Sequence, residues 1–600
     1  MFAVDEGSAS ETTRARFTAR SGRWRGLMLF PAVLAVLAVS VGQAGGLGVW
    51  GEATPVVFAD GVQDMDSPFA DFSAVSCASA GNCTAVGRFR NPNSDDEAFT
   101  LTSTDGEWGE PTPVAFDSIA QGSNPPSEFS DVSCASAGNC TAVGSYEGSD
   151  GDNAFTMTST MTPSGIEWSP VTPVFDESDV YSSTLSGVSC SSAENCVVVG
   201  EFSVDGDYSD AFVLTLTDGT WGPVTPVVFT TDEADPNGSS YLNDVSCVSV
   251  GNCTAVGKFD ILDEFGSASG DNAFTMTMTD GDWGSAVPAV FADGLRHSVP
   301  RADLDFVSCA SAGNCTAVGS FKLPVNYPRS ATGAFTITSS NGFWSEARPV
   351  VYDAEVVQKV DPYVYFNGVS CASAGNCTAI GTLKNDIGQY GQNRAFIVSM
   401  TSGEWGEATL AIAETAQNVL TAQNVLNESM LNGVSCVSAG QCTVVGNFWV
   451  IDENNNYSSS SFTMTSTGGA WGEVTPVVFA EGLQQVFPES SLSAVSCPTL
   501  GNCTAVGDFN NSLGDSQLFS LSSIDDTPVS TTTVAPTPIA ETTTTVALAS
   551  NASPTTIVSP TTTAAPLLPA TGSETNGWLL AGLGAMVAGA VLVARRRMTV

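Results

Sequence analysis

Eight copies of the motif C-x5-C contain all sixteen cysteines of this 600-residue chain, and this repeat constrains the fold more than any other feature. The first cysteines of successive copies lie 56 to 65 residues apart. Each pair encloses a five-residue turn such as ASAGN, whereas zinc sites favour C-x2-4-C and redox sites favour C-x-x-C. We therefore expect eight local disulfides. The pairs are Cys77 with Cys83, Cys134 with Cys140, Cys190 with Cys196, Cys247 with Cys253, Cys309 with Cys315, Cys371 with Cys377, Cys436 with Cys442, and Cys497 with Cys503.

Two further elements recur with the cysteines. One is a hydroxyl-rich stretch such as NAFTMTST, and the other starts at a tryptophan, as in WGEATPVVF. Period-two alternation of apolar and hydroxyl residues, together with β-branched runs, predicts strands. We expect four per copy: strand A ending near VSC, strand B starting at CTAVG, strand C in the hydroxyl-rich stretch and strand D after the tryptophan. Four antiparallel strands in about 60 residues are typical of a β-propeller blade.

The order of the elements predicts how such a ring would close. The chain opens with a lone D element at residues 50–58 and ends with an A, B and C set at 491–523. An N-terminal strand would then complete the last blade, whereas an open solenoid would need capping repeats. We therefore expect an all-β fold, one eight-bladed β-propeller over residues 50–525. The alternative is a string of small β-domains.

The turn between strands C and D reads TSTDGEWG or MTDGDWG in the clearer copies. It resembles the Asp-box of sialidase-type propellers, S-x-D-x-G-x-x-W, although Asp and Gly are adjacent here and some copies lack the acid. This resemblance supports the fold and implies no activity. The repeat as a whole is similar to the VSC-x-SAxxC-x-AVG repeats of exported actinobacterial proteins.

The N-terminus has the three parts of a secretion signal. Five arginines precede an apolar run at residues 27–41, and small residues follow around Ala44. The run is short for a membrane-spanning helix, which favours a cleaved signal peptide over an anchor. We expect residues 1–44 to be removed and the rest to be secreted into a compartment that permits disulfides.

The C-terminus has a stalk and a sorting signal. Residues 526–567 are rich in Thr and Pro and predict a disordered stalk. An LPATG motif follows, formed by Leu568, Pro569, Ala570, Thr571 and Gly572; then come an apolar segment at 577–594, expected to be a transmembrane helix, and three arginines. Residues 568–600 thus resemble the cell-wall sorting signal of Gram-positive surface proteins. The resemblance implies that a sortase cleaves after Thr571 and joins it to a peptidoglycan precursor. The alternative is a simple single-pass anchor.

The net charge of −44, from 63 acidic and 19 basic residues, excludes whole classes of partner. A nucleic-acid binder needs a basic patch to neutralise phosphates, and an anionic membrane surface would repel this chain. We expect contact with a membrane only through the signal peptide and the sorting-signal helix.

The loops indicate where a ligand would bind. In a four-stranded meander the A–B and C–D turns share one face of the ring, and these barely vary among the copies. The B–C and D–A loops share the other face and vary in length and content, as recognition loops do. They are rich in Asp, Asn, Ser, Gly and Tyr, which suits glycan hydroxyls or calcium. The acidic positions singled out for a ligand or calcium are Asp150, Asp152, Asp205, Asp207 and Asp210. Because no EF-hand pattern is present, solvated loops without metal or other cofactor are the favoured interpretation.

No catalytic residue stands out. The single histidine, His297, is expected at the surface, and the arginines show no pattern that would grip a sialidase substrate. The sequence therefore predicts a non-enzymatic surface module that binds a glycan or a protein through its variable loops. The alternatives are a secreted carbohydrate-active enzyme with paired carboxylates and a structural coat protein.

Overall fold

The computed structural model describes residues 48–524 except 65–67, 117–123, 177–178, 232, 263–265, 267, 293–300, 324–330, 353–361, 386–391, 412–423, 452–456 and 481–488. The predicted signal peptide, stalk and sorting signal lie outside these residues. All regular elements of the described part are strands. None of its residues belongs to a helix long and apolar enough to cross a membrane.

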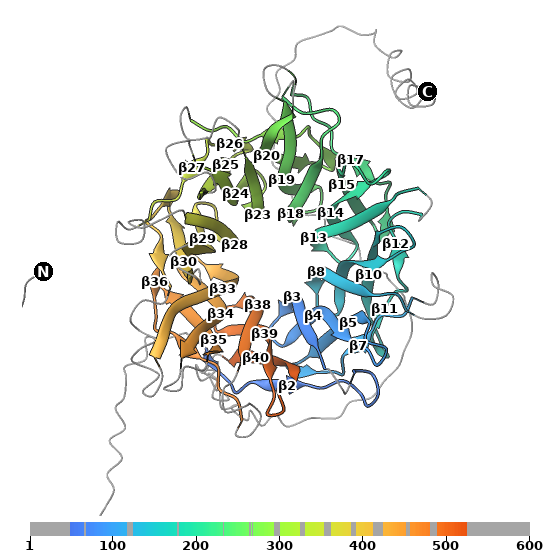
Figure 1. Cartoon of the computed structure of the whole chain (residues 1–600), viewed down its shortest axis with the longest axis vertical. Coiled ribbons are helices and arrows are strands. Elements are labelled where there is room, and N and C mark those ends of the chain that lie inside the picture. Colours follow the sequence, from blue (N-terminus) through green and yellow to red (C-terminus); the bar gives the residue numbers. More distant parts are fainter. Residues whose placement is uncertain are drawn as a thin grey trace, which may run out of the picture. The chain divides into compact units, whose positions relative to one another are not determined.

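The strands form eight antiparallel sheets arranged as the blades of a closed ring, which confirms the predicted eight-bladed propeller (Figure 1). Strand A of each blade lies nearest the centre. The A strands of blades 1 to 8 are β3 (Ala70–Ser79), β8 (Ser127–Ser136), β13 (Ser182–Ser192), β18 (Ser240–Ser249), β23 (Ala302–Ser311), β28 (Pro362–Ser373), β33 (Asn424–Ser438) and β38 (Ser490–Thr499). The B strands are β4 (Asn82–Arg90), β9 (Asn139–Glu147), β14 (Asn195–Ser203), β19 (Asn252–Leu262), β24 (Asn314–Lys322), β29 (Asn376–Asn385), β34 (Gln441–Ile451) and β39 (Asn502–Asn510). The C strands are β5 (Asp96–Thr104), β10 (Asp152–Thr162), β15 (Asp210–Thr217), β20 (Ala268–Thr279), β25 (Thr332–Ser340), β30 (Gln392–Thr401), β35 (Tyr457–Thr467) and β40 (Ser516–Ile524).

The outer strand D is present in every blade but consists of two short pieces, both paired with strand C. A proline ends or lies within the second piece in all blades but the sixth, and proline lacks the N–H that a longer ladder would need. The first pieces are β6 (Glu107–Trp108), β11 (Gly165–Trp168), β16 (Thr220–Trp221), β21 (Asp282–Trp283), β26 (Phe343–Trp344), β31 (Glu404–Trp405), β36 (Ala470–Trp471) and β1 (Val49–Trp50). The second are β7 (Thr112–Pro113), β12 (Thr172–Pro173), β17 (Thr225–Pro226), β22 (Val287–Pro288), β27 (Arg348–Pro349), β32 (Thr409–Leu410), β37 (Thr475–Pro476) and β2 (Thr54–Val56).

The N-terminal strand closes the ring, as the order of the elements predicts. β1 pairs with β40 through Val49 and Ile524, and β2 pairs with the same strand through Pro55 and Phe519. Phe58, just after β2, then packs against Phe89 of blade 1, with ring centroids 4.7 Å apart. Both ends of the described chain therefore hold blade 8 together.

The hydrophobic core lies between blades rather than within them. Each cluster of buried side chains draws on two consecutive copies of the repeat; Phe116 at the end of blade 1, for example, packs against Phe155 and Tyr146 of blade 2 at 5.4 and 5.3 Å. The aromatic residue that ends the WGEATPVVF element thus covers the sheet of the following blade. This burial is the main force that stacks the blades.

The glycine of each AVG motif is required by a β-bulge in the neighbouring A strand. In blade 5 the pairing of β23 with β24 shifts register between Leu304 and Phe306. A Cβ placed on Gly319 would collide with the backbone carbonyl of Asp303. The other AVG-type glycines meet the same obstacle, so the repeat keeps the residue without a side chain.

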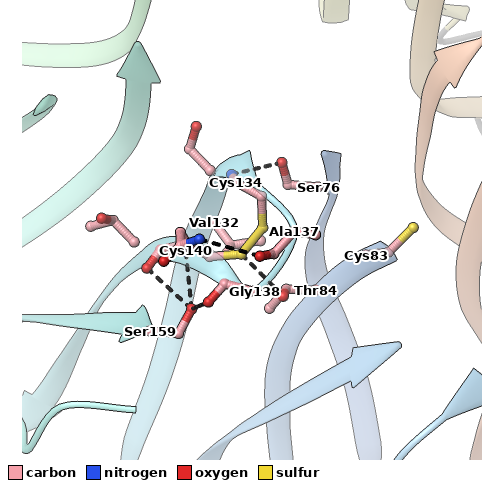
Figure 2. The surroundings of a disulfide bond; sticks show 12 residues. Ser76, Cys83, Thr84, Val132, Cys134, Ala137, Gly138, Cys140 and Ser159 are labelled. Carbon is pink, nitrogen blue, oxygen red and sulfur yellow. Dashed lines mark hydrogen bonds between the residues drawn. A yellow bond between two sulfur atoms is a disulfide. The ribbon is translucent and has the colours of Figure 1, made fainter. Parts of the chain in front are cut away.

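The disulfides lie at the A–B hairpins, and they pair the cysteines within each motif as predicted. Figure 2 shows the surroundings of Cys134–Cys140. The N–H of Cys134 donates to Ser76 Oγ of the preceding blade over 3.0 Å. The hydroxyl of Thr84, also from that blade, lies 3.2 Å from Cys140 Sγ and is the donor because a disulfide sulfur carries no hydrogen.

Both contacts recur around the ring. The serine contact is present at all eight blade junctions, at 2.9 to 3.1 Å. The threonine contact is present at seven. At the junction of blades 3 and 4 the threonine position is Val197, which has no hydroxyl. The sequence VSC…CT thus joins consecutive blades as well as closing each hairpin.

Candidate functional site

The A–B and C–D turns form one face of the ring, which we call the turn face. In blade 1 the N–H of Gly106 in the C–D turn donates to the carbonyl of Gly81 in the A–B turn over 2.8 Å. Asp105 and Gly106 both have positive φ, 51° and 91°, which is the geometry of a two-residue type I′ hairpin turn. This geometry is why Asp and Gly are adjacent here instead of separated as in the Asp-box. The equivalent turn-to-turn hydrogen bond occurs in five other blades, through Gly219–Glu194, Gly281–Gly251, Gly342–Gly313, Gly403–Gly375 and Gly469–Gly440.

The B–C and D–A loops form the opposite face, which we call the loop face. The acidic positions predicted for a ligand or calcium lie here and are exposed: Asp150 is between β9 and β10, Asp205 and Asp207 are between β14 and β15, and Asp152 and Asp210 are the first residues of β10 and β15. Asp205 Oδ1 accepts a hydrogen bond from the N–H of Asp207 over 3.2 Å, so this carboxylate caps its own loop. Across the described ranges, no three acidic, histidine or cysteine side chains are gathered closely enough to hold a metal ion. His297 lies outside the described residues.

A small polar cavity of ≈190 Å³ opens on the loop face between blades 1 and 2. Its acidic lining residues are Asp96, Glu128, Glu147 and Asp152, and its basic one is Arg88. Asp152 is therefore the one predicted ligand position that lines this cavity.

Arg88 is held in place from two blades. Its guanidinium binds Asp71 on the adjacent strand at 3.2 Å and Glu128 of blade 2 at 2.9 Å. These charges link blades 1 and 2 beside the cavity. Arg90 makes a further ion pair with Asp96 at 3.1 Å. The cavity therefore has a fixed cationic wall and an excess of carboxylates.

The inner rim beside this cavity contains carboxyl groups with altered acidity. Burial, together with the charge of Asp71, raises the pKa of Asp508 in blade 8 to about 6. Burial also raises the pKa of Asp71, although Arg88 acts in the opposite direction. Two carboxyl groups that influence each other thus have unlike environments, since only Asp71 is paired with Arg88.

A second charged cluster joins blades 4 and 5. Lys258 Nζ lies 3.1 Å from Asp303 Oδ2, and the amide of Asn243 donates to Asp303 Oδ1 over 2.8 Å. Asp305 Oδ2 is buried and finds no hydrogen-bond partner among the described residues, and burial with the charge of Asp303 raises the pKa of Asp305 well above its usual value.

Because the sequence prediction considered the loops, it missed the charged residues that belong to strands: Asp71, Arg88, Lys258, Asp303 and Asp508. The sequence does contain a signal for this position: the residue after each AVG-type glycine differs from copy to copy, whereas the flanking positions change little. In blades 1 to 8 it is Arg88, Ser145, Glu201, Lys258, Ser320, Thr382, Asn447 and Asp508.

Comparison with known proteins identifies the C-terminal segment. Residues 560–598 match the LPXTG cell wall anchor motif. No curated protein matches the chain significantly in sequence.

Solved structures that resemble the chain include an ulvan lyase of a polysaccharide lyase family, 8% identical with a TM-score of 0.35, over 79% of this chain and 95% of that one. A second polysaccharide lyase is 10% identical with a TM-score of 0.39, over 64% of this chain and 88% of that one. An α-L-arabinanase from Penicillium chrysogenum in complex with arabinobiose is 11% identical with a TM-score of 0.29, over 69% and 98%. Likenesses this distant carry no argument about activity or substrate.

The anchor motif, together with the fold, defines the kind of protein. An LPXTG signal is processed by a sortase, which attaches the chain to peptidoglycan. The chain is a surface protein covalently anchored to the cell wall, and it displays an eight-bladed, disulfide-bearing β-propeller.

Proposed function

We propose that the propeller is a binding module that recognises an extracellular glycan through its loop face. The observation that carries the proposal is the polar cavity of ≈190 Å³ that opens on this face between blades 1 and 2, lined by four carboxylates and the guanidinium of Arg88.

The chemistry of the loop face supports a polar ligand. The cavity between blades 1 and 2 offers carboxylates and a fixed guanidinium, groups that hydrogen-bond sugar hydroxyls. Exposed tyrosines lie on the neighbouring loops: Tyr181 and Tyr208 are 47% and 53% exposed. Such aromatic residues suit the apolar side of a sugar ring.

The proposal is tested with the full-length protein, purified in detergent, on an array of neutral, amino and acidic glycans. The variant Asp152→Asn should weaken the binding found with the natural protein, because this carboxylate lines the cavity. The matched control is Asp105→Asn, the same change on the turn face, which should bind as the natural protein does. Absence of glycan binding, or equal loss in both variants, would contradict the proposal.

A carbohydrate-active enzyme is the second candidate, and one observation favours it. Burial and the charge of Asp71 raise the pKa of Asp508 to about 6, and pairs of carboxyl groups in unlike environments serve as acid and base in glycan cleavage. Chromatography of each bound glycan after long incubation distinguishes the two functions. Cleavage products that are absent with the Asp508→Asn variant would establish an enzyme. Glycans that stay intact would support the binding module instead.

A further inference from the structure

The largest cavity that we describe lies on the turn face, where the invariant turns predict only scaffold. It has a volume of ≈350 Å³ and occupies the crevice between blades 4 and 5. This size is within the range of roughly 300–1,000 Å³ that is typical of small-ligand sites. The equivalent crevice between blades 7 and 8 has only ≈20 Å³. The same repeat therefore builds an open crevice at one junction and a closed one at another.

One difference between the two crevices lies in the A–B turn. The turn residue that lines the open crevice is Ala312, whereas Leu500 occupies the same position beside the closed one. The leucine is 37% exposed and lines the closed crevice, where its longer side chain takes up space that the alanine leaves open. A leucine at this turn is evidently compatible with the fold.

The lining of the open crevice has no charged side chain, in a chain whose net charge is −44. Its polar groups are hydroxyls and amides, such as those of Thr277 and Asn341, and Met278 is among its apolar side chains. Disulfides Cys247–Cys253 and Cys309–Cys315 brace its two sides. A cationic ligand would find no acid in it, and an anionic ligand would be repelled by the protein as a whole. The uncharged lining therefore favours a neutral ligand that bears hydroxyl groups.

The C–D turn of blade 5, beside the crevice, lacks the acidic residues that other copies have, which suits a neutral ligand. Blades 1 and 4 read DGE and DGD before the tryptophan, whereas blade 5 reads NGF, so Asn341 and Phe343 stand where the other two blades have acids. Phe343 directly follows the lining residues Asn341 and Gly342 and is 83% exposed, and Val250 of the blade 4 turn is 56% exposed. An exposed aromatic residue next to a cavity is available to a ligand that enters it.

We propose that this crevice is a second binding site, for a neutral carbohydrate whose ring stacks on Phe343 and whose hydroxyl or acetamide groups reach the amides and hydroxyls of the walls. The site is independent of the loop-face function. Both the N-acetylated glycan of the wall and neutral hexose chains from outside the cell are sources of this chemistry.

The test is calorimetric titration of the full-length protein in detergent with four tetrasaccharides. Chitotetraose represents N-acetylated wall glycan and mannotetraose a neutral glycan from elsewhere; a glucosamine tetramer and a galacturonate tetramer are the charged counterparts. Binding of either neutral sugar in preference to both charged ones supports the proposal, and the better neutral ligand identifies the source. No binding of a neutral sugar at millimolar concentration, or stronger binding of a charged one, overturns it.

Two variants locate the site. Ala312→Leu copies the turn of blade 8 and should abolish binding by filling the crevice, while Phe343→Ser should weaken it about tenfold through loss of the ring contact. The matched control, Ala80→Leu, makes the same change at the turn of blade 1 and should bind as the natural protein does. Unchanged affinity in Ala312→Leu and Phe343→Ser, or equal loss in Ala80→Leu, would overturn the assignment. Melting curves show that each variant is folded.

Discussion

Ser496 Oγ accepts a hydrogen bond from the backbone N–H of Cys77 over 3.0 Å, although 419 residues separate the two in the chain. This contact completes the circle of eight hydrogen bonds that cysteine N–H groups donate to serine hydroxyls. The other seven join blades that follow one another in the sequence. The junction of blades 8 and 1 therefore uses the same bond as every other junction. Ring closure is a property of the repeat together with the N-terminal strand.

The substitution Ser496→Ala should lower the free energy of unfolding by about 1–3 kcal/mol, because the N–H of Cys77 loses its acceptor in a partly buried junction. Denaturant titration of the full-length protein in detergent measures the effect. Ser493→Ala serves as the control, since the side chain of Ser493 makes no hydrogen bond with the described residues. A Ser496→Ala midpoint equal to that of the control would show that the bond contributes nothing.

Deletion of residues 48–58, which include β1, β2 and Phe58, should destabilise the whole propeller. The deletion leaves the edge of β40 unpaired and exposes the faces of Phe89 and Phe99 that Phe58 covers. An unpaired apolar edge invites pairing between chains, so we expect a lower melting temperature and oligomers on size-exclusion chromatography. Deletion of eleven residues from the predicted stalk, 530–540, is the control. A melting curve that matches the control would refute the role of the N-terminal strand.

Much of the architecture was predictable because it is encoded locally and eightfold. The cysteine spacing fixes the A–B hairpin, the Asp-Gly or Ser-Gly pair fixes the C–D turn, and the offset of the elements fixes the closure. The contacts between copies were not predictable, because periodicity sets the register within a blade and does not reveal which side chains of neighbouring blades meet. The serine of VSC is an example: its partner is the cysteine of the following copy.

The candidate site was predicted less well than the fold. The loop face was expected from the variable loops, but of its five acidic positions only Asp152 lines a cavity. Arg88 and Lys258 bind carboxylates of the following blade, Glu128 and Asp303, and such pairs become visible only once the blades are stacked. The neutral crevice depends in part on Ala312, but six of the eight A–B turns have alanine at this position, so only the cavity volumes distinguish this junction.

Stability should fall as the pH rises from about 4 to 7. Asp131 and Asp244 are half-buried between blades, where their Oδ2 atoms accept the N–H of Val188 at 3.0 Å and of Val307 at 2.8 Å. Burial raises the pKa of Asp131 to about 6 and that of Asp244 to about 7, against 3.8 for an exposed aspartate. The unfolded chain then releases these protons at lower pH than the folded one, so stability present below pH 4 is lost as the pH approaches 7.

Thermal unfolding of the full-length protein in detergent at several pH values measures this slope. Asp244→Asn should flatten it, whatever the variant does to absolute stability, because a neutral amide does not titrate. The control Asp105→Asn removes an exposed acid and should keep the natural slope. A natural protein whose melting temperature rises steadily from pH 4 to 7 would contradict the assignment of raised pKa values.

Attachment to the wall should depend on Thr571, the residue whose carbonyl a sortase transfers to the peptidoglycan precursor. The LPXTG match covers this position, and the reaction needs the threonine–glycine bond of the motif. We expect Thr571→Ala to shift the protein from the covalent wall fraction to the membrane and the medium, because the signal is exported but not cleaved efficiently. Immunoblots of walls boiled in detergent and then digested with a muralytic enzyme measure the bound fraction. The control Thr562→Ala changes a threonine of the predicted stalk and should leave that fraction unchanged; equal wall attachment in both variants would mean that the chain is held there by something other than sortase.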